Sequence, residues 1–181
     1  MPKIDGRSLA QPTGPSLYIC AAHPYVMEGS FLIFFHSLLR WLVLLALVIA
    51  AGTAWRGWLA QRPIIVWERS VTILAMVLCH VQLLLGLVLY MINFKSYTIV
   101  GMRGGSTGLT NDVVRYWKYE HIGMMILAIA LVTIGRVLSK RAKEEPAKQR
   151  HIALFYTAGL LLILYMIPWP FTFLGAGRGW L

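Results

Sequence analysis

Three histidines lie inside long apolar runs of the sequence, one in each of three separate runs. They are His36 in "FFHSLLRW", His80 in "LCHVQLLLG" and His121 in "YEHIGMM". An ionisable side chain inside a membrane costs free energy unless it finds a partner, so each histidine is a candidate functional residue. A neutral imidazole is an axial ligand of haem iron, and helix bundles hold such cofactors between facing helices. The pattern therefore raises the question of a bound haem.

Three further polar residues accompany these histidines: Arg40, Gln82 and Glu120. Arg40 follows His36 by one helical turn, and it could be the countercharge of a haem propionate or the ion-pair partner of Glu120. Gln82 and Glu120 are candidate hydrogen-bond or proton partners of the histidines. Membrane histidines also serve as interhelical hydrogen-bonding residues without any cofactor, so a structural polar network is the competing interpretation.

The composition is that of an integral membrane protein. Of the 181 residues, 58% are hydrophobic and only 13% are charged, which is far more apolar than a soluble domain tolerates. A helix needs about 20 apolar residues to cross the hydrocarbon layer, and four stretches are long enough. The predicted helices cover about 30–57, 64–94, 112–139 and 147–172. Short connections within each pair predict an all-α, up-down-up-down four-helix transmembrane bundle over 28–174, between an N-terminal tail at 1–27 and a C-terminal tail at 175–181.

The net charge of +10 is concentrated at the ends of the apolar runs, where it meets lipid head groups rather than nucleic acid. Nine basic residues stand in the two short hairpins: Arg56, Arg62, Arg69, Arg136, Lys140, Arg141, Lys143, Lys148 and Arg150. Positively charged loops stay in the cytoplasm. We therefore expect a multi-pass protein of the bacterial inner membrane with both termini outside.

The depth of each histidine decides which two could share one haem. Counted from the basic hairpin residues, the helical rise places His36 at about 30 Å, His80 at about 16 Å and His121 at about 22 Å. His36 and His80 are too far apart in depth to pair. The count favours His36 with His121, whose helices would be diagonal, and it leaves His80 with His121 as the alternative pair. His151 matches none of them.

The remaining residues of interest are interpreted as packing. Cys20 and Cys79 are not spaced as a metal or haem-attachment pair, and Cys79 is predicted to be a small buried residue. The sulfur-containing and aromatic side chains near the histidines are also assigned to packing: Met76, Met124, Met125, Tyr90 and Trp117.

Four segments together resemble the small four-helix membrane proteins of Bacteroidota that are labelled "cytochrome B". They are "FFHSLLRWLVLL" (34–45), "LCHVQLLLGLVLYMI" (78–92), "YEHIGMMILAIALVTIGR" (119–136) and "IALFYTAGLLLILYMIPWPF" (152–171), in order over about 28–172. The segment "HVQLLLGLVLY" is also loosely similar to a helix of haem A synthase. Members of the family begin shortly before the histidine motif, so Met27 is the expected natural start and 1–26 upstream sequence.

The family resemblance implies one b-type haem. It carries over His36, Arg40, Trp41, His80, Gln82, Glu120, His121 and the "IPWPF" ending at 167–171. The expected function is electron transfer through haem b, with His121 and either His36 or His80 as ligands, in contact with a quinone, other membrane redox proteins or a second copy. An electron carrier or subunit is expected rather than a stand-alone enzyme. The alternatives are a cofactor-free accessory or assembly subunit of a larger membrane complex and a small proton-relay element.

Overall fold

The computed structural model describes residues 24–102, 112 and 115–172, and their side chains over 31–94, 112 and 115–172. The expected C-terminal tail and all but the last four residues of the expected N-terminal tail lie outside this part, as does Cys20. Within it, every regular element is a helix. The elements are α1 (Pro24–Leu59), α2 (Val66–Met102), the π-helical turn η1 (Tyr116–Glu120), α4 (His121–Arg141) and α5 (Glu145–Met166).

The helix ends differ from the sequence-based boundaries in two places. Helix α1 runs from Pro24, the first described residue, so it includes the six residues before its expected start near residue 30. Helix α2 continues to Met102, whereas a loop was expected from residue 95. No proline interrupts this stretch, and the first Gly-Gly pair stands at 104–105. Hydrophobicity alone placed the start of α1 too late and the end of α2 too early, because both helices extend beyond their apolar runs.

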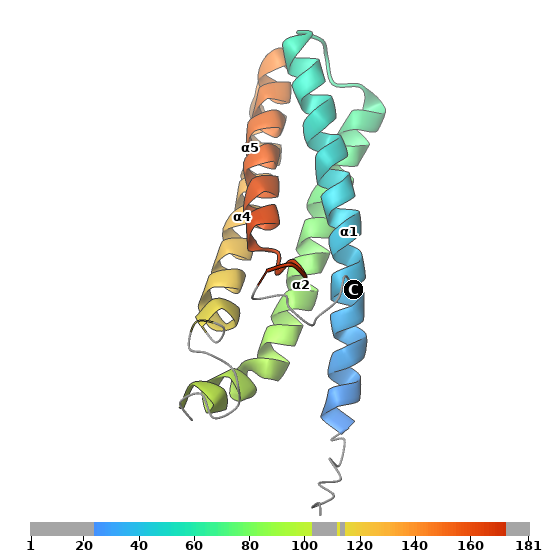
Figure 1. Cartoon of the computed structure of the whole chain (residues 1–181). Helices are drawn as coiled ribbons and strands as arrows, with labels where there is room; N and C mark the ends of the chain where they lie inside the picture. The colour runs from blue at the N-terminus through green and yellow to red at the C-terminus, as the bar shows by residue number, and fades with distance from the viewer. Residues whose placement is uncertain (1–23, 103–111, 113–114, 173–181) are drawn as a thin grey trace, which may run out of the picture.

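The four long helices form the predicted antiparallel bundle (Figure 1). Helix α1 packs against α2 and α5, and α4 packs against α5 and α2. Helices α1 and α4 are therefore diagonal to each other, as the up-down-up-down arrangement requires. Residues on α1 and α4 that point to the bundle axis face the same central space.

Three segments are long and apolar enough to cross a membrane: Phe31–Leu59, Val66–Phe94 and Tyr116–Arg141. Helix α5, which was expected to be a fourth span, is not among them. Its first turns carry Glu145, Lys148, Gln149 and Arg150, so its apolar part begins only at Ile152. The outer faces of the helices expose large apolar side chains, as a lipid-facing surface does: Leu45 is 58%, Leu84 63% and Leu161 60% exposed.

The two basic hairpins lie at the same end of the bundle and contact each other. Glu68 is only 3% exposed and accepts two hydrogen bonds from the guanidinium of Arg62, at 2.5 and 3.1 Å. Across the hairpins, the backbone N–H of Ile64 donates to the Glu145 carboxylate at 3.4 Å. These contacts join the chain before α2 to the start of α5.

Small side chains let the helices pack closely in the half of the bundle next to the hairpins. Ala50 and Ala54 of α1 are almost fully buried, as are Ala75 of α2 and Ala153 of α5. The hydroxyl of Tyr156, also fully buried, donates to the backbone oxygen of Thr72 at 2.8 Å. The close packing of this half leaves the opposite half, which holds the polar residues of interest, with the wider interior.

Candidate cofactor site

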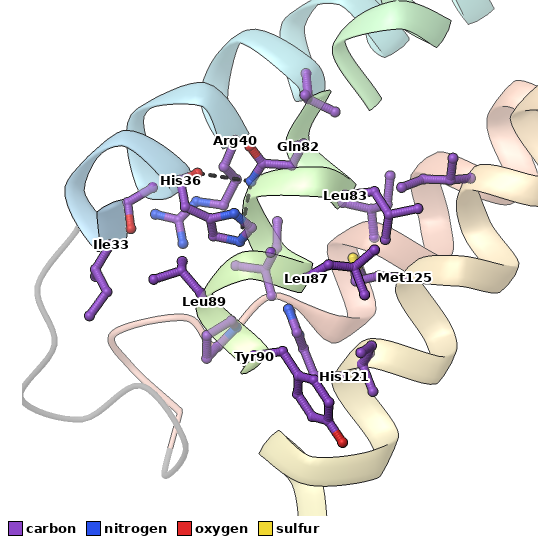
Figure 2. A pocket seen from close by; sticks show the side chains of 18 of the residues that line it. Ile33, His36, Arg40, Gln82, Leu83, Leu87, Leu89, Tyr90, His121 and Met125 are labelled. Atoms are coloured by element: carbon purple, nitrogen blue, oxygen red, sulfur yellow. Dashed lines mark hydrogen bonds between the residues drawn. The ribbon is translucent and has the colours of Figure 1, made fainter. Parts of the chain in front are cut away.

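A cavity of about 530 Å³ lies between the helices in the half away from the hairpins. All four long helices and η1 contribute to its wall, and most of the lining is apolar. His36, Arg40 and Gln82 gather on one side of this cavity, and His121 lies on another side near Tyr90 (Figure 2). The volume falls in the range of about 300–1,000 Å³ that small-molecule and cofactor pockets occupy.

His36 is held in place by α2. The side-chain amide of Gln82 donates to the backbone oxygen of His36 at 2.8 Å, and its nitrogen lies 3.4 Å from Nε2 of the ring. Gly86 lies one turn further along α2, and a β-carbon there would come within 3.2 Å of Cε1 of His36. The Nδ1 atom of His36 is buried and has no hydrogen-bond partner in the described part of the chain. An amide N–H only donates, so in this arrangement Nε2 accepts and Nδ1 carries the proton of the neutral ring. His36 therefore has a fixed position, and its Nε2 can bind a metal once the long contact with the Gln82 amide is given up.

His121 is the first residue of α4 and is held by the end of α5. Its Nδ1 lies 3.2 Å from the backbone oxygen of Met166. A carbonyl oxygen only accepts, so Nδ1 carries the proton of the neutral ring and Nε2 keeps its lone pair. The hydroxyl of Tyr116 donates to the same oxygen at 2.5 Å and lies 3.3 Å from Nδ1. No hydrogen bond within the described residues engages Nε2, so this atom can bind a metal.

Arg40 lines the cavity but does not pair with Glu120, which corrects one expectation. The carboxylate of Glu120 accepts a hydrogen bond from Nε of Arg115 at 2.7 Å and is 40% exposed. Arg115 immediately precedes the π-helical turn, so it reaches Glu120 over a single turn of helix. Glu120 is absent from the described lining of the cavity. The guanidinium of Arg40 contacts the ring of Trp41, with Cζ 5.3 Å from the ring centroid.

His80 does not line the cavity and is exposed on the outside of the bundle. Its Nδ1 lies 2.8 Å from the backbone oxygen of Met76 in its own helix, and its Nε2 lies 3.5 Å from the hydroxyl of Thr133. Thr133 stands twelve positions from His121, which is about 18 Å along α4. The structure therefore does not bring together His80 and His121, the alternative pair.

The depth count misplaced His121 because its reference residue lies inside the helix. Arg136 was taken as the cytoplasmic boundary, but α4 continues to Arg141. Measured from that end, His121 is about 30 Å deep, while His36 is about 34 Å from the end of α1 at Leu59. The two histidines therefore share nearly the same depth, in agreement with their common cavity.

Several residues of this site escaped the sequence analysis. Tyr90, Trp117 and Met125 line the cavity, although they were assigned to packing. Cys79 also reaches the cavity wall and is fully buried as a free thiol, which confirms that it is a buried residue. Gly86 and Tyr116 were not considered. The available signal for Gly86 was its position one turn after Gln82 on the same helix face.

The donor set fits a haem better than a bare metal ion. No group of three or more His, Cys, Asp or Glu side chains able to hold a metal ion occurs among residues 24–102, 112 and 115–172. A haem iron already has four nitrogen ligands from its macrocycle, so two imidazoles complete its coordination. His36 and His121 both line this cavity, where the Nε2 of His121 has no described hydrogen bond and that of His36 lies 3.4 Å from the Gln82 amide nitrogen. No family model, curated protein or solved structure matches the chain.

Proposed function

We propose that this protein is a membrane b-type cytochrome that carries electrons through one haem b held between His36 and His121. The observation that carries the proposal is that these two imidazoles, from diagonal helices, line one cavity of cofactor size. Two imidazole ligands leave no open position on the iron, which favours electron transfer over oxygen chemistry. His80, which lies outside the cavity, has no part in ligation.

Each cavity residue has a role in this proposal. A haem, when bound, supplies the one-electron chemistry. His121 binds through Nε2 and is oriented by the Met166 carbonyl, while His36 is oriented by Gln82. Arg40 provides a cation on the same wall, as a propionate carboxylate requires. The apolar remainder of the wall keeps water away from the iron and so helps to set its reduction potential.

The placement in the cell follows from the charged hairpins. We place the two basic hairpins in the cytoplasm and both termini outside the bacterial inner membrane, because positively charged loops stay in the cytoplasm. The cavity then lies in the outer half of the membrane. A quinone or a neighbouring membrane redox protein is the class of donor and acceptor that this position serves.

A visible difference spectrum tests the proposal. The protein is expressed in a bacterial membrane with excess haem precursor, purified in mild detergent and measured reduced minus oxidised. We expect Soret and α bands with about one haem per chain, as in other b-type cytochromes. If the bands are absent, the Gln82–His36 contact is a cofactor-free polar network, and an accessory subunit becomes the better interpretation.

A further inference from the structure

The end of α5 leaves two defined carbonyls without a helical hydrogen-bond donor. In an α-helix each carbonyl accepts from the N–H four residues later, and the last carbonyls of a helix have no such donor. Pro168 has no N–H to give to the carbonyl of Leu164, and the extended backbone of Ile167 ends the helix, so the carbonyl of Met166 also lacks a helical donor. Two backbone oxygens at this helix end are therefore open to other donors.

Side chains satisfy both of these oxygens. The indole N–H of Trp169 donates to the Leu164 oxygen at 3.0 Å, and the backbone N–H of Trp169 bonds the Ile167 oxygen instead of continuing the helix. The Met166 oxygen receives the hydroxyl of Tyr116 and faces Nδ1 of His121. The Leu164 carbonyl thus accepts from a residue of its own segment. The Met166 carbonyl instead faces His121, the candidate haem ligand on the neighbouring helix.

The π-helical turn η1 brings Tyr116 and His121 to the same carbonyl. The backbone N–H of His121 bonds the Tyr116 oxygen, five residues back. In a regular α-helix only residues three or four apart are neighbours. The π turn instead brings the two rings to a centroid distance of 5.7 Å, and such turns occur frequently at functional sites.

We infer that the Met166 carbonyl and Tyr116 form a positioning unit that fixes the tautomer of His121 and tunes the basicity of its Nε2. The carbonyl holds the proton on Nδ1 and leaves Nε2 as the donor atom. An acceptor at Nδ1 raises the basicity of a ligating imidazole. The Tyr116 hydroxyl shares this acceptor and so weakens its pull on His121. The tautomer does not depend on a bound cofactor, whereas the tuning of a reduction potential rests on the proposed haem.

The tautomer is measured by ¹⁵N NMR of histidine-labelled, haem-free protein in lipid nanodiscs, with a His121→Gln variant to assign the signal. We expect His121 to carry its proton on Nδ1. Trp169→Phe is the control for changes at this helix end, because it removes only the bond to Leu164 and should leave the His121 signal unchanged. A wild-type His121 with its proton on Nε2 would overturn the inference, as would a His121 signal that moves equally in Trp169→Phe and in Tyr116→Phe.

Tyr116→Phe gives a second test that keeps the helix end intact. Without the hydroxyl, the Met166 oxygen serves His121 alone, and the Nδ1 proton resonance should move downfield. In haem-loaded protein the midpoint potential should fall in Tyr116→Phe and stay unchanged in Trp169→Phe, since a more basic ligand stabilises ferric iron. A bound haem with the same potential in Tyr116→Phe and wild type would disprove the tuning. A missing haem band would instead count against the proposed function and leave the tautomer result standing.

Discussion

Gly86 on α2 and His36 on α1 are in contact so close that a β-carbon at position 86 would lie 3.2 Å from Cε1 of the imidazole. A β-carbon at this crossing would push the ring by a few tenths of an ångström, and a branched side chain would displace it further. The same ring is held from one turn away by Gln82, which donates to the His36 backbone oxygen. The position of this candidate ligand is thus determined mainly by α2.

Gly86→Val should displace the His36 ring and weaken haem binding. Changes to groups that orient a metal ligand cost about 10- to 100-fold in affinity, and we expect a loss in that range. Haem titration of the purified protein, followed in the Soret region, measures it. Gly52→Val is the matched control, because a β-carbon at position 52 meets no atom within 4 Å. Equal affinity in Gly86→Val and wild type would show that the ring does not need this contact.

Arg62→Met should destabilise the hairpin end of the bundle, because it leaves the carboxylate of Glu68 buried without its cation. Glu68 is 3% exposed and Arg62 32% exposed. We expect the free energy of unfolding to fall, by less than for a fully buried ion pair, since Arg62 is partly solvated. Unfolding in mixed micelles with increasing SDS measures this change.

The double variant Arg62→Met, Glu68→Gln distinguishes charge from packing. Removing the buried carboxylate as well should restore most of the stability lost in the single variant. If the double variant is less stable than Arg62→Met, the pair contributes through its hydrogen bonds and packing rather than through compensation of a buried charge.

The stability of the α5 start should depend on pH on the acidic side. The ammonium of Lys148 hydrogen-bonds the carboxylate of Glu145 and lowers its pKa, with a further contribution from the backbone N–H of Ile64. A lowered pKa in the folded state means that this stabilisation is present above the unfolded-state value, about pH 4.3, and is lost as the pH falls through the folded-state value. Glu145→Gln should flatten the acid limb of the melting temperature against pH. An unchanged acid limb in this variant would assign the slope to other carboxylates.

The fold was predictable because the lengths of the four apolar runs and the positions of the charged hairpins indicate the same topology. The all-α bundle, its order and the diagonal placement of the first and third helices all followed from four apolar runs joined by short turns. Helix ends were less predictable. The extension of α2 begins with the polar stretch 95–98, and the two residues added to α4, Lys140 and Arg141, are charged, so the apolar runs stop short of both helix ends.

The candidate site was predictable as a set of residue types but not as a set of contacts. The choice between His36 and His80 depended on a few residues at helix ends, since each residue shifts the depth by about 1.5 Å. The partner of Glu120 depended on a π-helical turn, which has no sequence signature. The Met166 carbonyl is a backbone group, so no side chain indicates its role. Only the prolines that follow it in the sequence could have indicated that it lacks a helical donor.

Single replacement of the histidines in haem-loaded protein tests the central claim most directly. His36→Ala, His80→Ala and His121→Ala are purified with haem, and the ferric low-spin signal is recorded by optical and electron paramagnetic resonance spectroscopy. We predict that His36→Ala and His121→Ala each lose the six-coordinate low-spin signal, while His80→Ala keeps it at wild-type intensity. Loss of the signal in His80→Ala together with its survival in His36→Ala would contradict the proposed site.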